Sequence, residues 1–354
     1  MSNSSRSLPA GNSLVTAVLT MGALLMASPA WSIATVTRCG ETVQGNYKLD
    51  ADLDCSEYGY DYLGFLIVNG TLHLNGHTIT GKRTTDPDNK TPVIKCVYDC
   101  TIIGPGVIRQ GYIGVDAWED MTLENVELRE NTTAAAITLR SLTATDVTVT
   151  GNGSGLRGIF VDVVHSTISG NVSRGVACNN GISGGKAQCN VVDSTVTDNG
   201  RGISSDNRID MRGTVVSGSF EGVSSVRLRM DECVIQDNGD GGGIVTSGPT
   251  RIRNSQITGN TGDGVFVGGS GDHHTSKLKI ADSTVTGNGD SGLRSYGRSF
   301  VVTGTDVSGN CAAGDQTYCA DLSSCDALRV AGSTCGTSSN WCTDGAGFGV
   351  CSLD

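Results

Sequence analysis

The chain has 354 residues, including 50 glycines and 13 cysteines, and a formal net charge of −11 at pH 7. An acidic chain of this kind is not expected to bind nucleic acid. No segment approaches 18 consecutive apolar residues, which excludes an ordinary membrane-spanning helix. A phosphate-binding loop, a dinucleotide fingerprint and a zinc motif are also missing from the sequence.

Residues 1–30 have the pattern of a secretory signal peptide. Arg6 lies in a serine-rich start, an apolar stretch of 14 residues runs from Leu14 to Ala27, and Ser28-Pro29-Ala30 precedes a plausible cleavage point. The sequence therefore predicts a secreted protein, either extracellular or periplasmic. In that setting the cysteines are expected to form disulfides rather than to bind metal.

Two cysteine-containing segments are expected to cover the ends of the fold. The N-terminal cap is predicted at 39–62 within a main unit of 31–310, and a Cys-rich C-terminal cap at 311–354. Proximity in sequence suggests the pairs Cys39 with Cys55, Cys96 with Cys100 and Cys178 with Cys189, and leaves six cysteines for the C-terminal cap. Cys233 is then unpaired, and its position in the repeat predicts a buried thiol.

Between Met121 and Asn310 one short phrase occurs nine times, at intervals of 19 to 28 residues. It consists of a run of alternating apolar residues, an Asn or its equivalent, and a Gly followed by Ile, Val or Leu. The Asn position is filled by Asn131, Asn152, Asn171, Asn199, Ser219, Asn238, Asn260, Asn288 and Asn310. A repeat of this length is typical of a solenoid.

Each repeat reads as strands and turns. Apolar residues alternate with period 2 and no helical spacing is present, which excludes leucine-rich and ankyrin repeats. Three strands are expected per repeat: one before the Asn, one opened by the Gly, and a third leading into the next repeat. With two earlier repeats around residues 72–81 and 101–107, the sequence predicts an all-β, single-stranded, right-handed parallel β-helix of about 11 coils with disulfide-bonded caps.

The repeated Asn is interpreted as structural. Asn tolerates the left-handed conformation of a turn, and stacked side-chain amides can bond from coil to coil. No chemistry is assigned to it.

The motifs Cys39-Gly40, Leu53-Asp54-Cys55 and Leu74-Asn-Gly-His-Thr-Ile-Thr-Gly81, followed by the Asn-Gly coils, resemble the secreted bacterial right-handed parallel β-helix repeat proteins. The resemblance covers residues 39–354. That fold serves pectate-type lyases, alginate lyases and epimerases, polygalacturonases and non-catalytic surface proteins. It implies a substrate groove on the sheet built from the third strand of each coil, with loops that enter this strand as its walls.

Basic side chains gather on the outward face of the third strand in four successive coils. They are Arg208 and Arg212, Arg227 and Arg229, Arg251 and Arg253, and Lys277 and Lys279. Like charges about 5 Å apart repel by on the order of 0.8 kcal/mol in water. Two interpretations stay open: a solvated face with interleaved ion pairs from Asp210 and Asp231, or a groove in which guanidinium groups bind the carboxylates of an acidic polysaccharide.

The loops suggest candidates for catalysis. The two insertions that lengthen coils to 28 residues both enter the third strand, and the second carries His273 and His274 just before Lys277. A uronate lyase must neutralise a carboxylate, remove the neighbouring proton and protonate the leaving oxygen. Lys279 is a candidate for the first task, His273 or His274 for the second and Tyr296 for the third. Solvent exposure for the histidines and packing for Tyr296 remain alternatives.

Asp210 and Asp231 are the alternative acid and base, because a hydrolase needs two carboxylates roughly 5 to 9.5 Å apart. Against this reading, Arg212 and Arg229 are expected to keep both ionised. The sequence also lacks the Asn-Thr-Asp, Asp-Asp and Gly-His-Gly signatures of polygalacturonases, the Asp-Pro-His-Glu signature of mannuronan epimerases and the Arg-x-Pro-x-x-Arg pattern of pectate lyases.

The first hypothesis is therefore an enzyme that cleaves an acidic, uronate-containing polysaccharide by β-elimination. The protein is expected to be a monomer without an organic cofactor, and calcium is possible but not evident. A non-catalytic glycan-binding or structural surface protein is the second hypothesis, and a glycoside hydrolase that uses paired aspartates is the third.

Overall fold

A computed structural model of the chain describes residues 33–58, 64–84, 90–180, 186–268, 276–297, 299–311, 319–325, 328–340 and 349–351. The predicted signal peptide, the two histidines His273 and His274 and parts of the C-terminal cap therefore lie outside the described residues. Within these ranges the structure is all-β: it has 36 strands, which pair in parallel with the equivalent strands of neighbouring coils. The described residues include no helix long and apolar enough to cross a membrane.

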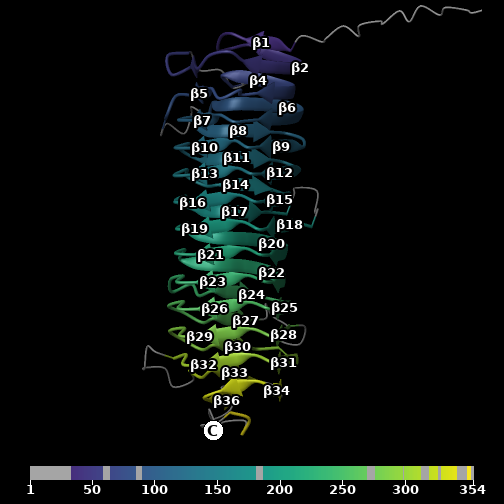
Figure 1. Cartoon of the computed structure of the whole chain (residues 1–354), viewed down its shortest axis with the longest axis vertical. Coiled ribbons are helices and arrows are strands. Elements are labelled where there is room, and N and C mark those ends of the chain that lie inside the picture. Colours follow the sequence, from purple (N-terminus) through teal and green to yellow (C-terminus); the bar gives the residue numbers. More distant parts are fainter. Residues whose placement is uncertain are drawn as a thin grey trace, which may run out of the picture. The chain divides into compact units, whose positions relative to one another are not determined.

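The strand that precedes each repeated Asn forms a ladder of its own, which we call the first ladder (Figure 1). Its members are β3 (Leu53–Asp54), β5 (Thr78–Thr80), β7 (Val107–Arg109), β10 (Glu127–Arg129), β13 (Thr148–Thr150), β16 (Thr167–Ser169), β19 (Thr195–Thr197), β21 (Val215–Ser217), β23 (Val234–Gln236), β26 (Gln256–Thr258), β29 (Thr284–Thr286), β32 (Asp306–Ser308) and β35 (Thr334–Cys335). The first ladder thus begins and ends in the two segments that the sequence assigns to caps.

The strands that follow the Asn turn form the second ladder. Its separate strands are β8 (Ile113–Ala117), β11 (Ala134–Thr138), β14 (Leu156–Gly158), β17 (Arg174–Cys178), β24 (Ile244–Thr246), β27 (Val265–Val267), β30 (Leu293–Ser295), β33 (Leu322–Ser324) and β36 (Ser338–Asn340). The third ladder contains β9 (Met121–Glu124), β12 (Ser141–Thr145), β15 (Phe160–Val164), β18 (Gln188–Val192), β25 (Thr250–Arg253), β28 (Lys277–Ala281), β31 (Ser299–Thr303) and β34 (Leu328–Ala331).

In some coils a single long strand serves both the second and the third ladder. These strands are β6 (Pro92–Ile103), β20 (Arg201–Arg212) and β22 (Glu221–Asp231); β4 (Leu66–His73) pairs along both parts of β6, and β2 (Thr42–Leu49) joins β4 to β1 (Ala34–Val36). Three ladders of parallel strands stacked coil upon coil are a parallel β-helix, which confirms the fold predicted from the repeat.

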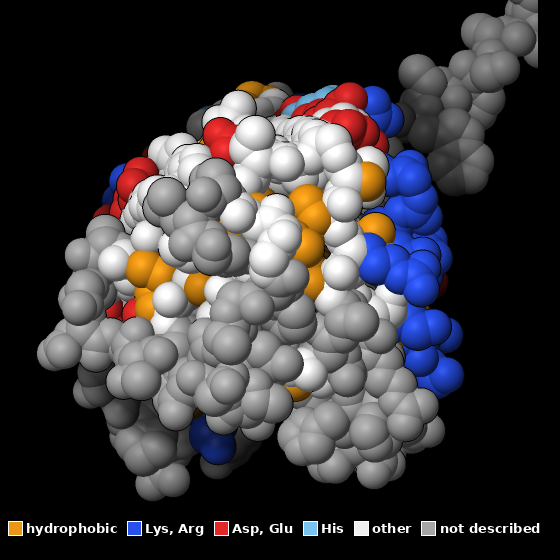
Figure 2. All heavy atoms as spheres, turned by 90° about the horizontal axis from the view of Figure 1, so that it is seen from below, with side chains coloured by type: hydrophobic (Ala, Val, Ile, Leu, Met, Phe, Trp, Pro, Cys, Tyr) orange, Lys and Arg blue, Asp and Glu red, His pale blue; other side chains and the backbone are white. Residues whose placement is uncertain are grey.

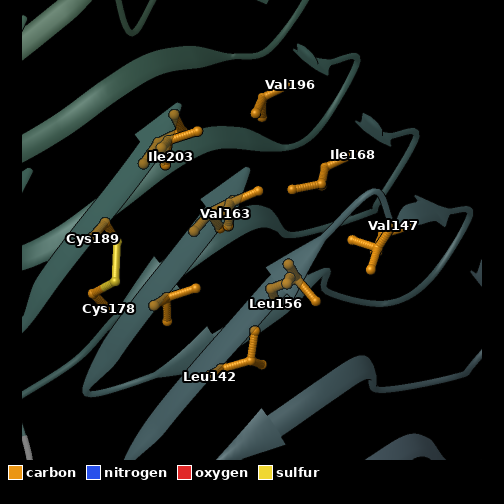
Figure 3. Close-up of a cluster of buried hydrophobic side chains, with 14 of the residues drawn as sticks. Leu142, Val147, Leu156, Val163, Ile168, Cys178, Cys189, Val196 and Ile203 are labelled. Atoms are coloured by element: carbon orange, nitrogen blue, oxygen red, sulfur yellow. A yellow bond between two sulfur atoms is a disulfide. The ribbon is translucent and has the colours of Figure 1, made fainter. Parts of the chain in front are cut away.

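The core fills the inside of the coils. The branched apolar residue three positions before each repeated Asn is fully buried, and register pairs it with its equivalent in the next coil, as for Leu128, Val149 and Ile168. Figure 3 shows such side chains converging from the ladders, among them Leu142, Leu156 and Val163. Burial of each such side chain contributes about 1.5–3 kcal/mol, so the alternation of apolar residues accounts for the packing of the strands.

The disulfides follow the predicted pairing. Cys39 bonds Cys55, Cys96 bonds Cys100 and Cys178 bonds Cys189, and the last pair lies inside the core between β17 and β18 (Figure 3). The C-terminal segment adds Cys311–Cys319 and Cys335–Cys351, and Cys325 is disulfide-bonded as well. Cys233 is free and buried, as predicted, and its burial raises the pKa of the thiol to about 11. It is therefore an inert core residue.

The repeated asparagines form a buried file of hydrogen-bonded amides, which we call the asparagine ladder. The side chain of Asn152 donates to Asn171 at 3.1 Å, and that of Asn171 donates to Asn199 at 2.8 Å. The backbone N–H of each also donates to the side-chain oxygen of the next coil, at 3.0 and 3.1 Å. Stacked amides were predicted, and these contacts confirm them.

The expectation that the repeated Asn adopts the left-handed conformation of the turn is wrong. The left-handed residue of this turn is the one before it: φ is 56° at Glu130, 63° at Gly151 and 55° at Asp198, whereas none of the repeated Asn residues has a positive φ. The Asn itself must point inward to reach its neighbours. The preceding residue makes the turn, and a Gly or an acidic residue suffices there.

Ser219 interrupts the asparagine ladder. Its hydroxyl bonds to the carbonyl of Ser217 at 3.4 Å, and Asn199 donates to the carbonyls of Ile168 and Thr197. In the neighbouring coils a Gly makes room for each Asn; a Cβ on Gly175, for example, would lie 2.9 Å from the side-chain nitrogen of Asn199. Gly202 leaves the same room beside position 219.

We expect Ser219→Asn to stabilise the protein. The new amide would accept from Asn199 and donate to Asn238, and one or two added buried hydrogen bonds contribute about 1–2 kcal/mol to the free energy of unfolding. Urea denaturation of the variant and the parent protein measures this difference. An unchanged or lowered midpoint would mean that the break in the ladder carries no cost.

Asn171→Ala is the matched opposite. It leaves the buried N–H of Asn152 without its acceptor, so we expect a loss of about 2–4 kcal/mol in the same denaturation experiment. A loss below about 0.5 kcal/mol would show that side-chain amides do not hold the coils together.

Candidate functional site

The basic residues predicted on the third ladder do lie on one outward face. We call the side chains of Arg208, Arg212, Arg227, Arg229, Arg251, Arg253, Lys277 and Lys279 the basic ladder. Residues between them, such as Leu228, Ile252 and Leu278, are buried, so the alternation of the strands places the charged residues outside. Lys and Arg side chains gather along one side of the molecule in Figure 2.

Register aligns the centre of the basic ladder as expected. Arg229 is the partner of Arg251, and Arg251 is the partner of Lys279, on three successive coils. Neighbouring parallel strands lie about 4.8 Å apart, at which distance two like charges repel by about 0.9 kcal/mol in water. Charged groups that keep this spacing repel one another in the unliganded protein.

Two of the eight residues are already engaged by acidic neighbours. Arg208 binds Asp210 with both arms of its guanidinium fork, at 2.6 and 2.8 Å, and Arg212 pairs with Glu232 at 3.2 Å. The expected partners were different: the sequence placed Arg212 and Arg229 beside the two aspartates. Residues two apart on one strand face the same side, and this brings Arg208 to Asp210 within β20 itself.

The remaining six basic residues are unpaired. Among the described residues, no carboxylate lies within 4.0 Å of the charged group of Arg227, Arg229, Arg251, Arg253, Lys277 or Lys279. All six are exposed. The interpretation of this face as interleaved ion pairs thus holds only at its edge, in the coil of β20.

Two shallow depressions cross this face. One, of about 330 Å³, is lined by residues from β20, β22, β25 and β28, including Arg227, Arg251 and Lys279. The other, of about 450 Å³, is lined by Arg212, Arg229, Arg253 and both candidate acids, Asp210 and Asp231. Arg229 and Arg251 line both, so the depressions adjoin and form one basic surface.

The two candidate acids are diagonal neighbours. Register pairs Asp210 with Arg229 and Asp231 with Arg212, so the aspartates are offset by two residues on adjacent coils. Asp210 accepts from Arg208 and from Gln188 at 3.1 Å, and Asp231 accepts from Asn254 at 2.8 Å. Asp210 is held by its partners and is therefore poorly placed to transfer a proton.

The predicted catalytic residues Lys279 and Tyr296 line different surfaces. Lys279 lies within the basic surface, whereas Tyr296 packs edge-to-face on Phe266, with ring centroids 5.5 Å apart, and lines another groove. That groove, which we call the aromatic groove, has a volume of about 730 Å³. It is lined by Ser205, Asp206, Ser224, Ser225, Val226, Val245, Thr246, Ser247, Phe266, Gly268 and Tyr296.

An ion pair beside the aromatic groove was missed in the sequence. Asp263 approaches Arg294 at 3.6 Å, and the guanidinium of Arg294 lies 5.6 Å from the Phe266 ring and 6.0 Å from the Tyr296 ring. Burial raises the pKa of Asp263 to about 6, although Arg294 opposes the shift. No sequence signal distinguishes Asp263 from Asp240, an exposed aspartate in the turn one coil earlier.

The described residues include no group of three or more His, Cys, Asp or Glu side chains arranged to hold a metal ion.

Comparison with known proteins gives the fold its name. The sequence model of the family described as "Right handed beta helix region" matches residues 203–334, and no curated protein matches the sequence. This match covers 132 of the 354 residues, and its description agrees with the stacked parallel strands of the described residues.

The chain is weakly similar to several solved structures. A Dettilon tailspike protein has 9% identity over 84% of this chain and 60% of its own, with a TM-score of 0.39. The A-module of the Azotobacter vinelandii mannuronan C-5 epimerase AlgE4 has 14% identity over 85% and 81% of the two chains, with a TM-score of 0.35. The corresponding AlgE6 module has 12% identity, 87% and 79% coverage and a TM-score of 0.26. The chain spans 60% of the tailspike, which is less than two thirds of its length.

The raised pKa of Asp263 predicts a pH dependence of stability. In the folded protein this carboxyl keeps its proton up to about pH 6, whereas in the unfolded chain it loses the proton near pH 4. The free energy of unfolding should therefore fall as the pH rises from about 4 to 6, by up to about 3 kcal/mol. Urea unfolding at several pH values should show this fall in the parent protein and not in Asp263→Asn.

Asp240→Asn is the control, because Asp240 is exposed at the corresponding turn. It should keep the pH profile of the parent. Parallel profiles for Asp263→Asn and the parent between pH 4 and 6 would mean that Asp263 titrates as an ordinary surface carboxyl.

Proposed function

We propose that this protein binds an acidic, uronate-containing polysaccharide along the basic ladder. The observation that carries the proposal is a set of six exposed cations on three successive strands, β22, β25 and β28, which have no carboxylate partner among the described residues, in a chain whose net charge is −11. Solubility alone does not require like charges at equivalent positions of successive coils, where they repel one another. Carboxylates of a bound ligand would turn this repulsion into attraction.

The shape of the surface suits a chain rather than a single small anion. The basic ladder covers the coils of β20, β22, β25 and β28, a distance of about 14 Å at the usual strand spacing. Each guanidinium fork can donate hydrogen bonds to both oxygens of a carboxylate. A polymer with regularly spaced carboxylates can occupy several of these sites at once, so weak single contacts add up.

β-Elimination is the reaction that we propose for this site. Arg229, Arg251 and Lys279 line the basic surface where a substrate carboxylate would be neutralised. The proton transfers would fall to His273 or His274, which immediately precede β28 in the chain, and to Tyr296 at the edge of the adjoining aromatic groove. Non-catalytic binding of the same polymer is the alternative, and hydrolysis by Asp210 and Asp231 is disfavoured because Asp210 is held by Arg208.

We also propose that the protein works outside the cytoplasm, as a monomer and without an organic cofactor. Five disulfides are found among the described residues, and structural disulfides persist in oxidising compartments. The apolar N-terminal segment also supports export, because residues 1–30 have the pattern of a signal peptide.

We expect the triple variant Arg229→Gln, Arg251→Gln, Arg253→Gln to lose at least about tenfold in affinity for the acidic polymer that the parent protein binds. Each exposed ion pair contributes up to about 1 kcal/mol, and 1.4 kcal/mol is a factor of ten. Calorimetric titration with size-defined oligomers of alginate, pectate, glucuronan and glycosaminoglycans measures the change, and added salt should weaken parent binding.

The control carries the same change of charge elsewhere: Arg38→Gln, Arg140→Gln, Arg157→Gln, all at exposed positions. It should bind as the parent does. Equal binding by parent and ladder variant, with both folded, would reduce the basic ladder to a solvated surface. Equal binding of single-stranded DNA by the parent would point to a general affinity for polyanions.

For β-elimination we expect absorbance near 235 nm to rise when the purified protein is incubated with the polymer that it binds. The double bond formed in the product absorbs there. A double variant His273→Ala, His274→Ala should abolish the rise while binding remains. If absorbance stays flat and no new reducing ends appear, the protein binds the polymer without cleaving it.

A further inference from the structure

The aromatic groove has a definite shape, set by a change of side-chain size along one file. Register aligns Ser204, Ser224, Val245 and Phe266 on the outward face of the second ladder. Small residues occupy three coils, and a large ring follows in the fourth. The floor therefore consists of Ser224 and Val245, and the Phe266–Tyr296 pair forms a wall at one end.

The wall is held in place. Arg294 lies within 6.0 Å of the centroids of both rings and is paired with Asp263, whose side chain is 14% exposed. An edge-to-face ring pair beside a fixed cation keeps its orientation. Such preorganised rings bind a flat ligand face with little loss of side-chain freedom.

The chemistry of the lining differs from that of the basic ladder. Among the described residues, no Lys or Arg lines the aromatic groove; the described lining consists of four serines, a threonine, one aspartate, two valines, a glycine and the two aromatic rings. Hydroxyl groups donate to and accept from other hydroxyls, and ring faces and valines pack on C–H groups. Asp206 would repel an anionic ligand.

The two surfaces are continuous along the chain. Val226 lines the aromatic groove, and the next residue, Arg227, lines the basic surface. In the following coil, Ser247 lines the aromatic groove and Pro249 lines the basic surface. A linear ligand can therefore pass from one to the other. The volume of about 730 Å³ falls within the usual range of roughly 300–1,000 Å³ for ligand sites.

We propose that the aromatic groove is a subsite for a neutral sugar ring, and that the polysaccharide carries neutral residues next to its uronates. The C–H face of a pyranose would pack on Phe266 and Tyr296, and its hydroxyls would bond the serines. The identification of the ligand as one mixed polymer rests on the proposed function; the neutral sugar site itself does not.

The test uses the full-length protein and calorimetric titration with a panel of neutral oligosaccharides: gluco-, manno-, galacto- and N-acetylglucosamine oligomers. We expect one of these to bind the parent protein. Two variants, Phe266→Ala with Tyr296→Ala, and Val245→Phe, which fills the floor, should each weaken that binding at least about tenfold. The second keeps the aromatic wall intact and guards against a local folding defect in the first.

Two controls isolate the site. Phe220→Ala removes an aromatic ring that is 57% exposed at another turn, and the triple Arg→Gln variant of the basic ladder leaves the groove untouched. Both should bind the neutral oligomer within about twofold of the parent. The reverse pattern is expected for an acidic homopolymer, which Val245→Phe should bind as the parent does.

Absence of binding to every neutral oligomer, or binding that survives both groove variants, would overturn the subsite. Indifference of acidic oligomers to the triple Arg→Gln variant would instead overturn the proposed function and leave the neutral site standing. Oligomers that alternate uronate with neutral sugar should bind more tightly than either homopolymer if both surfaces belong to one ligand.

Discussion

Hydrogen bonding between parallel strands of neighbouring coils is the constraint on which the rest of this structure depends. It repeats every equivalent residue at one spacing of about 4.8 Å, inside and outside the coil. Inside, this spacing suits amides that bond to one another, as between Asn171 and Asn199. Outside, it forces side chains of like kind into files. The core and the surface of the solenoid are thus two results of a single geometric rule.

The two candidate surfaces use that rule differently. On the third ladder, a file of equal charge from Arg229 to Lys279 makes a surface that repels itself and attracts carboxylates. On the second ladder, a file of unequal sizes from Ser224 to Phe266 makes a hollow. Both arise without any change in the backbone. A ligand-binding face can therefore change by single substitutions while the stack of coils beneath it stays intact.

The sequence predicts the fold and the basic ladder because both depend only on alternation and alignment. The residue three positions before each repeated Asn points inward, and Arg229, Arg251 and Lys279 are in register, as expected. Details that depend on side-chain conformation could not be predicted. Asp210 pairs with Arg208 of its own strand and not with an arginine of a neighbouring coil. The aromatic groove could not be predicted either, because it depends on a difference in side-chain size between residues that are far apart in the sequence. The burial of Asp263 leaves no local sequence pattern.

The interruption of the asparagine ladder at Ser219 lies beside the longest strand pairing among the described residues. There β20 and β22 pair through both the second and the third ladder, from Arg201 with Glu221 to Arg212 with Asp231. Where side-chain amides fail to connect two coils, main-chain bonds connect them over an unusual length. These two coils are therefore joined by strand pairing without an amide contact. The basic ladder begins on this pair of strands, so one end of a bound polymer would lie over this junction and the rest over coils that Asn238, Asn260 and Asn288 also connect.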